Sequence, residues 1–136
     1  MAEYPATRFP VIGADASAFA VRERNLRLVH HVRSARHLRE RFFEADLFGE
    51  PAWDMLLDLY EAELSQQRTT VSSVCMASGV PATTALRWLR ALEEKCLVRR
   101  TRDPTDGRRK FLTLSESALM SINALFEEFA AQASKL

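Results

Sequence analysis

The sequence predicts a mainly α-helical protein with one small β-hairpin. Apolar residues recur at three- and four-residue steps along most of the chain, which is the period of a helix. Gly and Pro interrupt this period at 48–51 and 78–81 and separate one helix from the next. Between 97 and 114, Thr, Val and Phe stand on both sides of an Asp-Gly pair, a composition that favours two strands joined by a tight connection.

The composition indicates one globular domain whose charges are segregated along the chain. Of the 136 residues, 47% are hydrophobic and 27% are charged, and the formal net charge is only +1. Residues 20–42 contain seven Arg and two Glu, whereas residues 43–66 contain seven acidic residues and neither Lys nor Arg. Residues 87–110 contain nine basic and four acidic residues. Such segregation predicts a polyanion-binding face beside an acidic one.

Several classes of protein are disfavoured by the sequence. Cys75 and Cys96 belong to no Cys-x-x-Cys motif or Cys/His cluster, so we expect neither a metal site nor a cofactor. The first 17 residues lack the basic and apolar regions of a signal peptide, and no stretch approaches 18 apolar residues. A Gly-rich phosphate loop, HExxH and a nucleophilic triad are also missing. We therefore expect a non-enzymatic cytosolic protein.

The N-terminal part is expected to contain an arm and one long helix. Residues 1–15 are interpreted as an extended arm, either frayed or docked on a partner surface. Residues 16–47 are interpreted as a helix within a dimerisation segment, 16–50. The expected apolar face of this helix consists of Leu28, Val32, Ala35, Leu38, Phe42 and Ala45. Its arginines largely fall elsewhere on the helical wheel, and the acidic run 44–63 is expected to face solvent.

Two helices are expected next. Pro51 suits the first turn of a helix over 51–65, and the wide apolar face of this helix predicts a central, buried position. A short helix over 70–77 follows, with Thr70 or Ser72 as its N-cap.

A tight turn at 78–81 then leads into a helix over 81–95. Its expected inner face consists of Ala85, Trp88, Leu89 and Leu92. Strands over 97–102 and 109–114 complete the hairpin.

The last helix, 116–135, is expected to begin after Ser115 as its N-cap. Its apolar residues step by three and four in an a/d seam: Leu119, Ile122, Phe126, Phe129, Ala133 and Leu136. Such a seam needs a partner, which is the long first helix of the same chain, another subunit, or both. We interpret 116–136 as a C-terminal dimerisation helix, with Leu119, Ile122, Phe126 and Phe129 as its contact residues.

Helix, tight turn, helix and hairpin together form a winged helix-turn-helix, which we predict for 51–115. Gly79 supplies the unusual backbone angles of the turn. The start of helix 81–95 can then enter the major groove of DNA, while the hairpin, or wing, meets the backbone or the minor groove. The residues expected to contact DNA are Thr70, Ser72, Pro81, Ala82, Thr83, Thr84, Arg87, Arg90, Arg100, Arg108, Arg109 and Lys110.

Two aspartates are expected to hold the wing in shape. Asp103 and Asp106 lie close enough in sequence to pair with Arg100 or Arg108, and Asp106 and Gly107 are expected to make the turn. As exposed pairs they would contribute only about 0–1 kcal/mol to stability, so we expect them to orient the arginines. The alternative is a solvated hairpin without a ligand.

Residues 51–118 resemble the DNA-binding core of the MarR family of winged-helix transcriptional regulators. The resemblance rests on VSSVCMASGVPATTALRWLRALEEKCLVRR, DPTDGRR and LTLSESA. The family's wing carries an Asp-x-Arg element, matched by Asp106 and Arg108, whose Arg typically reaches DNA. The resemblance also implies a homodimer joined by its N- and C-terminal helices. It further implies that a small aromatic acid or an oxidant can release the DNA.

Two positions depart from this family. Cys96 stands where the family usually has Gly, at a position that often requires a left-handed backbone conformation. Pro81 replaces a common Ser and removes one capping hydroxyl. Basic neighbours of Cys96 favour a reactive thiolate, but no resolving cysteine lies close in sequence, so its redox role stays open.

These observations predict a sequence-specific regulator that binds double-stranded DNA, and we expect repression by a homodimer on a pseudo-palindromic site. The alternative is a winged-helix module that binds protein through the acidic segment 43–66 or the seam at 119–136. A small aromatic ligand, if there is one, is expected in the cleft between the first helix, the second helix and the DNA-binding lobe, near Trp53 and Tyr60.

Overall fold

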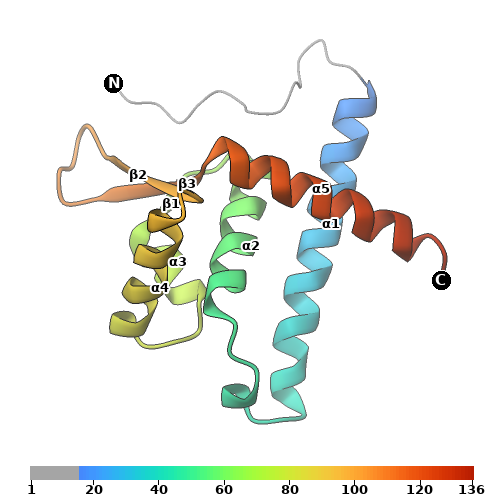
Figure 1. The fold of residues 1–136 in the computed structure, drawn as a ribbon, viewed down its shortest axis with the longest axis horizontal. Helices are drawn as coiled ribbons and strands as arrows, with labels where there is room; N and C mark the ends of the chain where they lie inside the picture. Colours follow the sequence, from blue (N-terminus) through green and yellow to red (C-terminus); the bar gives the residue numbers. More distant parts are fainter. Residues whose placement is uncertain (1–15) are drawn as a thin grey trace.

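The computed structural model describes residues 16–136, and in this part of the chain it contains five α-helices and a small antiparallel sheet (Figure 1). In chain order the elements are α1 (Ala16–Leu38), η1 (Arg39–Arg41), η2 (Ala45–Leu47), α2 (Pro51–Leu64), β1 (Thr69–Thr70), α3 (Val71–Ala77), α4 (Ala82–Glu94), β2 (Val98–Arg102), β3 (Lys110–Leu114) and α5 (Glu116–Ala133). The predicted class, mainly α with a β-hairpin wing, is confirmed. The arm expected at 1–15 lies outside the described residues.

α3 and α4 form the predicted helix-turn-helix. Thr70 caps α3, because its Oγ1 accepts a hydrogen bond from the N–H of Ser73 at 3.1 Å. Gly79 has a φ of +73°, a left-handed conformation that is costly for a residue with a side chain. The N–H of Gly79 donates to the carbonyl of Met76 at 3.3 Å and closes α3 before the chain enters α4.

The wing consists of β2 and β3, and β1 adds a strand that the sequence did not predict. The strand order is β1-β3-β2, with Thr69 paired to Leu112, Thr70 to Phe111, and Arg100 to Leu112 across the wing. A strand of two residues is too short to show an alternating pattern in the sequence, which is why β1 was not predicted. It forms because β3 offers an unpaired edge. This short strand ties the start of α3 to the wing.

The helix predicted over 16–47 is shorter than expected, since α1 ends at Leu38 and two 3-10 turns follow. Val29 is fully buried, but beyond it the side chains that face α2 include Arg33 and Arg36. The exposed members of the predicted apolar face are Ala35, Leu38, Phe42 and Ala45. Without apolar packing to support it, the helix does not continue.

α2 is the central helix, as predicted, and Tyr60 links it to α1 and α5. The Tyr60 hydroxyl accepts a hydrogen bond from Asn25 Nδ2 at 2.9 Å and donates to Asn123 Oδ1 at 2.7 Å. Its ring stacks on Phe126 with 5.2 Å between centroids. Burial raises the pKa of Tyr60 to about 12, so the hydroxyl keeps its proton and can donate to Asn123 at neutral pH.

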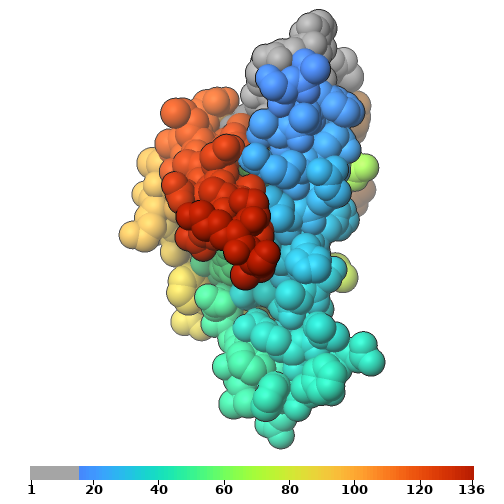
Figure 2. Space-filling model, turned by 90° about the vertical axis from the view of Figure 1, so that its right-hand side faces the viewer, coloured from blue at the N-terminus to red at the C-terminus, as the bar shows by residue number. Residues whose placement is uncertain are grey.

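α5 begins after Ser115, whose side chain accepts a hydrogen bond from the N–H of Ala118, as predicted. The first part of its seam is buried within the same chain, and the space-filling view shows α5 lying against α1 (Figure 2). The buried seam residues are Leu119, Ile122 and Phe126. Phe129 is 38% exposed, so the chain covers this seam residue only in part.

α4 buries Ala85, Leu89 and Leu92, but its predicted core residue Trp88 is 43% exposed. This prediction was wrong because Trp88 lies at the edge of the apolar stripe, where neighbouring helices no longer cover it. The chain leaves α4 through Cys96, which has a φ of +59°. The N–H of Cys96 donates to Glu93 and that of Leu97 to Leu92, which is the Schellman arrangement that normally favours Gly.

Along residues 16–136, none of the helices combines the length and the apolar character required to cross a membrane.

Candidate nucleic-acid interface

The wing loop is organised by the carboxylate of Asp103. Its Oδ1 accepts hydrogen bonds from the N–H and the Oγ1 of Thr105, both at 2.9 Å, and from the N–H of Asp106 at 3.3 Å. These bonds, that from the Thr105 N–H above all, lower the pKa of Asp103. The N–H of Asp103 also donates to the carbonyl of Arg109 at 3.1 Å and closes the loop. The buried Asp103 therefore fixes the backbone of the loop as an anion.

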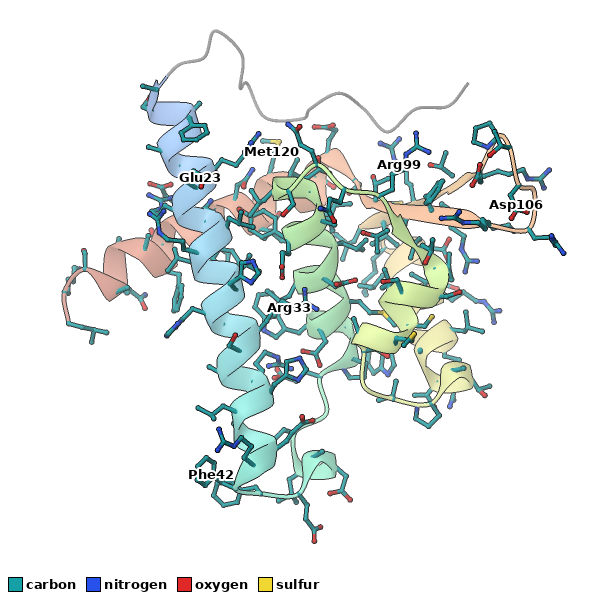
Figure 3. The ribbon with its side chains drawn as sticks, turned by 180° about the vertical axis from the view of Figure 1, so that it is seen from behind. Glu23, Arg33, Phe42, Arg99, Asp106 and Met120 are labelled. Carbon is teal, nitrogen blue, oxygen red and sulfur yellow. The ribbon has the colours of Figure 1, made fainter. Side chains whose placement is uncertain are left out.

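Asp106 orders the tip of the wing. Its Oδ1 accepts the N–H of Arg108 at 3.0 Å and lies 3.6 Å from Arg108 Nε, while its carbonyl accepts the N–H of Arg109. The Arg108 side chain is 96% exposed, and Figure 3 shows Asp106 near the far end of the wing. The turn is wider than the expected Asp-Gly connection, because residues 103–109 separate the two strands and Gly107 is not left-handed. The wing thus extends a nearly free guanidinium away from the body of the protein.

Of the two arginines expected to pair with the wing aspartates, Arg108 pairs with Asp106 and Arg100 pairs with neither. Its Nε and Nη2 bind the two carboxylate oxygens of Glu93 on α4, at 2.8 and 3.0 Å. Arg100 lies two residues after the buried Val98, so its side chain leaves β2 on the face turned toward α4. Arg109, which was not expected as a partner, lies beside Asp103, with its Nε 3.9 Å from Asp103 Oδ2.

A basic groove lies between the wing and the start of α3. It has a volume of about 510 Å³ and is lined by Thr70, Val71, Ser72, Arg100, Arg108, Arg109 and Lys110. Six of these seven residues are predicted DNA contacts, and β1 brings the α3 end of the groove against β3. The hydroxyl groups of Thr70 and Ser72 and the side chains of Arg108, Arg109 and Lys110 provide donors for phosphate oxygens, while Glu93 holds Arg100 at the groove wall.

Arg68 is a cationic residue beside this groove that was not predicted from the sequence. The guanidinium of Arg68 lies 5.1 Å from the centroid of the Phe111 ring, and that of Arg109 lies 5.3 Å from the same centroid. Arg68 precedes β1, so only the recognition of that two-residue strand could have placed it at the wing. Arg99 and Arg102 are also exposed on β2 and were not among the predicted contacts. The run of arginines at 99–102 is the sequence feature that could have identified them.

α4 presents the remaining predicted contact residues. Ala82, Thr83, Arg87 and Arg90 are exposed, Thr84 is partly buried, and Pro81 is the N-cap without a capping side-chain hydrogen bond. Figure 1 shows the wing on the same side of the molecule as α3 and α4, and on the opposite side from α1. The predicted residues on α4, the start of α3 and the wing therefore belong to one half of the protein. Leu86 and Met76, which were not predicted, are exposed there too.

The acidic residues of α2 do not form the solvated face that the sequence predicted. Arg33 binds Asp58 at 3.1 Å and Glu61 at 2.7 Å, and Arg36 binds Asp54 at 2.6 Å, so the basic and acidic runs meet between α1 and α2 (Figure 3). Burial raises the pKa of Asp58 despite the neighbouring Arg33. We call these five residues the α1–α2 ion-pair cluster. Its arginines are engaged with carboxylates.

A cavity lies where the ligand cleft was predicted, between the first helix, the second helix and the helix-turn-helix, but its lining includes neither Trp53 nor Tyr60. Tyr60 is fully buried by its partners on α1 and α5. The cavity has a volume of about 400 Å³ and lies between the end of α1, the η2 region, Asp54 at the start of α2 and the α3–α4 turn. Its lining includes Arg36, Arg39, Phe48 and Pro81, and Arg39 stacks over the Phe48 ring at 4.4 Å.

The cysteines and histidines form no metal-binding group among the described residues. Both cysteines are free thiols, and burial raises the pKa of Cys75, which disfavours its reactive thiolate. Cys96 is exposed. His30 lies 3.2 Å from Glu61 and His37 lies 3.7 Å from Glu40 at the surface.

No family model matches the sequence, and no curated protein matches it, but several solved structures do. A MepR mutant from a multidrug-resistant S. aureus clinical isolate is 29% identical over 63% of this chain and 64% of that chain, with a TM-score of 0.52. This match therefore spans less than two thirds of that protein.

Two further structures match over more of their length. S. aureus MepR in its complex with DNA is 24% identical over 80% of this chain and 85% of that chain, with a TM-score of 0.56. The transcriptional regulator PA4135 is 20% identical over 79% of each chain, with a TM-score of 0.54. These neighbours are winged-helix transcriptional regulators of the MarR type, and this chain shares their fold, which confirms the resemblance indicated by its helix-turn-helix and wing motifs.

Proposed function

We propose that this chain is a sequence-specific transcriptional regulator that binds double-stranded DNA. The observation that carries the proposal is the basic groove between the wing and α3, which lies on the half of the molecule that also exposes α4. MepR, which has the same fold, is known in a complex with DNA, and this supports the same partner here. In this proposal the groove holds the phosphate backbone while α4 enters the major groove.

The residues divide into two roles. Arg108, at the tip of the wing, enters the minor groove or contacts the backbone, and so contributes affinity without reading the sequence. Arg87, on the outward face of α4, reaches a base edge, where a bidentate contact to guanine discriminates by about 1–3 kcal/mol. Thr70 and Ser72 contact phosphate oxygens.

The test is a fluorescence anisotropy titration of the protein against a random duplex at two salt concentrations. A site with six to ten phosphate contacts loses roughly 10³–10⁵-fold in affinity between 50 and 200 mM salt, because bound counterions are released. Arg108→Ala should weaken binding to all sequences, and Arg87→Ala should change the sequences selected from a random pool. The matched control is Arg41→Ala, an exposed arginine on η1. If both site variants bound duplex DNA with the affinity and the sequence preference of the parent, the proposed contacts would be refuted.

The regulator acts as a homodimer in this proposal. Large apolar residues are exposed on α1 and α5, the two helices that would meet across the dimer: Phe19, Val21, Met120, Leu125 and Phe129. A two-fold axis would set two copies of α4 in successive major grooves, about one helical turn apart on a pseudo-palindromic site. Binding over a promoter would repress transcription.

In this proposal a small aromatic acid binds in the cavity at the end of α1, and its binding causes the protein to release DNA. The Phe48 ring offers a stacking surface, Arg39 offers a cation, and Pro81 connects the cavity wall to the start of α4. Addition of salicylate as a probe should weaken duplex binding by the parent and not by Phe48→Ala. An equal effect on both proteins would exclude this cavity.

The second candidate is a winged-helix module that binds protein. The exposed apolar residues of α5 favour it, whereas the engagement of the acidic α2 residues with Arg33 and Arg36 does not. A duplex titration without any salt-sensitive binding would favour this candidate over DNA binding.

A further inference from the structure

An apolar hollow lies beside the basic groove, on the outer surface between α3 and α4. Its volume is about 360 Å³. The apolar residues that line it are Val71, Cys75, Met76, Val80, Ala82 and Leu86. The hollow is open to solvent, so these side chains are available to a partner.

Two of these apolar residues are exposed to solvent. Met76 is 82% exposed and Leu86 is 39% exposed. Leu86 stands next to Arg87 on α4, and Thr83 and Arg90 are exposed on the same helix. An apolar surface within a polar, cationic surround indicates an interaction that the monomer does not satisfy.

The hollow is continuous with the proposed DNA surface. Val71 and Ser72 line both the hollow and the basic groove, which also contains Arg100 and Arg109. A phosphate backbone held in the groove would therefore bring the adjacent base edges close to the hollow. The strongly cationic surround favours a polyanion over an apolar peptide as the occupant.

One group in the DNA major groove has the matching chemistry. Thymine carries an apolar 5-methyl group there, whereas the other base edges present hydrogen-bond donors and acceptors. We propose that Leu86 and Met76, together with Ala82 at the start of α4, form a seat for thymine 5-methyl groups. The protein then selects thymine in each half-site by apolar contact, while Arg87 reads a neighbouring base by hydrogen bonding. This inference rests on the proposed DNA-binding function.

The test removes the methyl group and nothing else. A duplex selected from a random pool by the parent protein is resynthesised with deoxyuridine in place of thymine at single positions. At one or two positions in each half-site the affinity should fall by about fourfold, which corresponds to the burial of one methyl group. 5-Bromodeoxyuridine at those positions should restore binding, because bromine fills nearly the volume of a methyl group.

Leu86→Ala should reduce the thymine-to-uracil ratio of affinities at such a position to about one. Its matched control is Leu47→Ala, an exposed leucine on η2, which should keep the parental ratio. The inference is overturned if the parent binds the thymine and uracil duplexes equally. It is also overturned if Leu86→Ala keeps the parent's thymine-to-uracil ratio of affinities. Either result leaves DNA binding itself intact. Loss of all salt-sensitive duplex binding by the parent would instead refute the proposed function.

Discussion

At the residue scale, Cys96 holds a left-handed conformation where α4 passes into the wing. Such a conformation costs a residue with a Cβ about 1–2 kcal/mol, while Gly loses about 0.5–1 kcal/mol more conformational freedom on folding. We therefore expect Cys96→Gly to raise the free energy of unfolding by about 0.5–1 kcal/mol, measured by urea denaturation.

The neighbouring Lys95 provides the control for this substitution. Its φ is −85°, so Lys95→Gly relieves no strain and should lower the free energy of unfolding. A Cys96→Gly protein less stable than its parent would show that the thiol makes a contact worth more than the relief of the backbone.

Asp103 gives the wing a dependence on pH. Hydrogen bonds hold the pKa of its carboxyl below the ordinary 3.8, so the unfolded wing binds the proton more tightly than the folded one. The stabilisation is present above pH 3.8 and is lost as the pH falls through the lowered pKa. An NMR titration of the side-chain carboxyl should find this midpoint below 3.8.

Removal of the same carboxylate should loosen the wing at neutral pH. In Asp103→Ala the N–H groups of Thr105 and Asp106 lose their acceptor, so their hydrogen exchange should accelerate. The N–H of Ser73, which Thr70 caps, is the internal control and should keep its rate. Unchanged exchange at Thr105 would contradict the role given to Asp103.

At the scale of the elements, the α1–α2 ion-pair cluster aligns the long helix with the central one. The Arg36 side chain is only 13% exposed and binds Asp54 and Glu50. Its removal leaves two carboxylates without their cation. Breaking an exposed ion pair costs little stability and breaking a buried one costs several kcal/mol, and this half-buried site lies between them. Arg36→Ala should therefore lower the free energy of unfolding by about 1–3 kcal/mol. Chemical denaturation measures this effect.

The exposed Arg41 is the control for this element. Arg41→Ala should change the free energy of unfolding by less than about 0.5 kcal/mol. A loss of the same size in both variants would mean that Arg36 acts through the net charge of the protein and not through its two carboxylate partners.

The elements also differ in how far the sequence could predict them. The caps Thr70 and Ser115 are local signals, and both hydrogen bonds are present. The end of α1 was misjudged because its periodicity continues after Leu38 while the surface that would cover it does not. β1 has no signal of its own, since its two residues pair only through β3.

At the scale of the whole molecule, the apolar residues of α5 fall into a buried set and an exposed set. Leu119 and Phe126 pack inside the chain, while Leu125 and Phe129 remain 44% and 38% exposed. If this exposed face joins two subunits, a charge on it should prevent assembly. We expect the double variant Leu125→Glu/Phe129→Glu to be a folded monomer when the parent is a dimer, as measured by light scattering after gel filtration.

Leu47→Glu places the same charge on an exposed apolar residue of η2 and should leave the dimer intact. The helical circular dichroism of each variant checks that the fold survives. A parent that is monomeric at high concentration, or a double variant that still assembles, would remove the homodimer from the proposed function.

The sequence by itself determined the order of the helices, the Gly79 turn and the wing, because caps, turns and periodicity are properties of neighbouring residues. Only the tertiary structure decided which charges remain free. It joined Arg33 and Arg36 to the acids of α2, paired Arg100 with Glu93, and left Arg108 extended at the tip of the wing. Ion pairing depends on distances between elements far apart in the chain, and no local pattern encodes those distances.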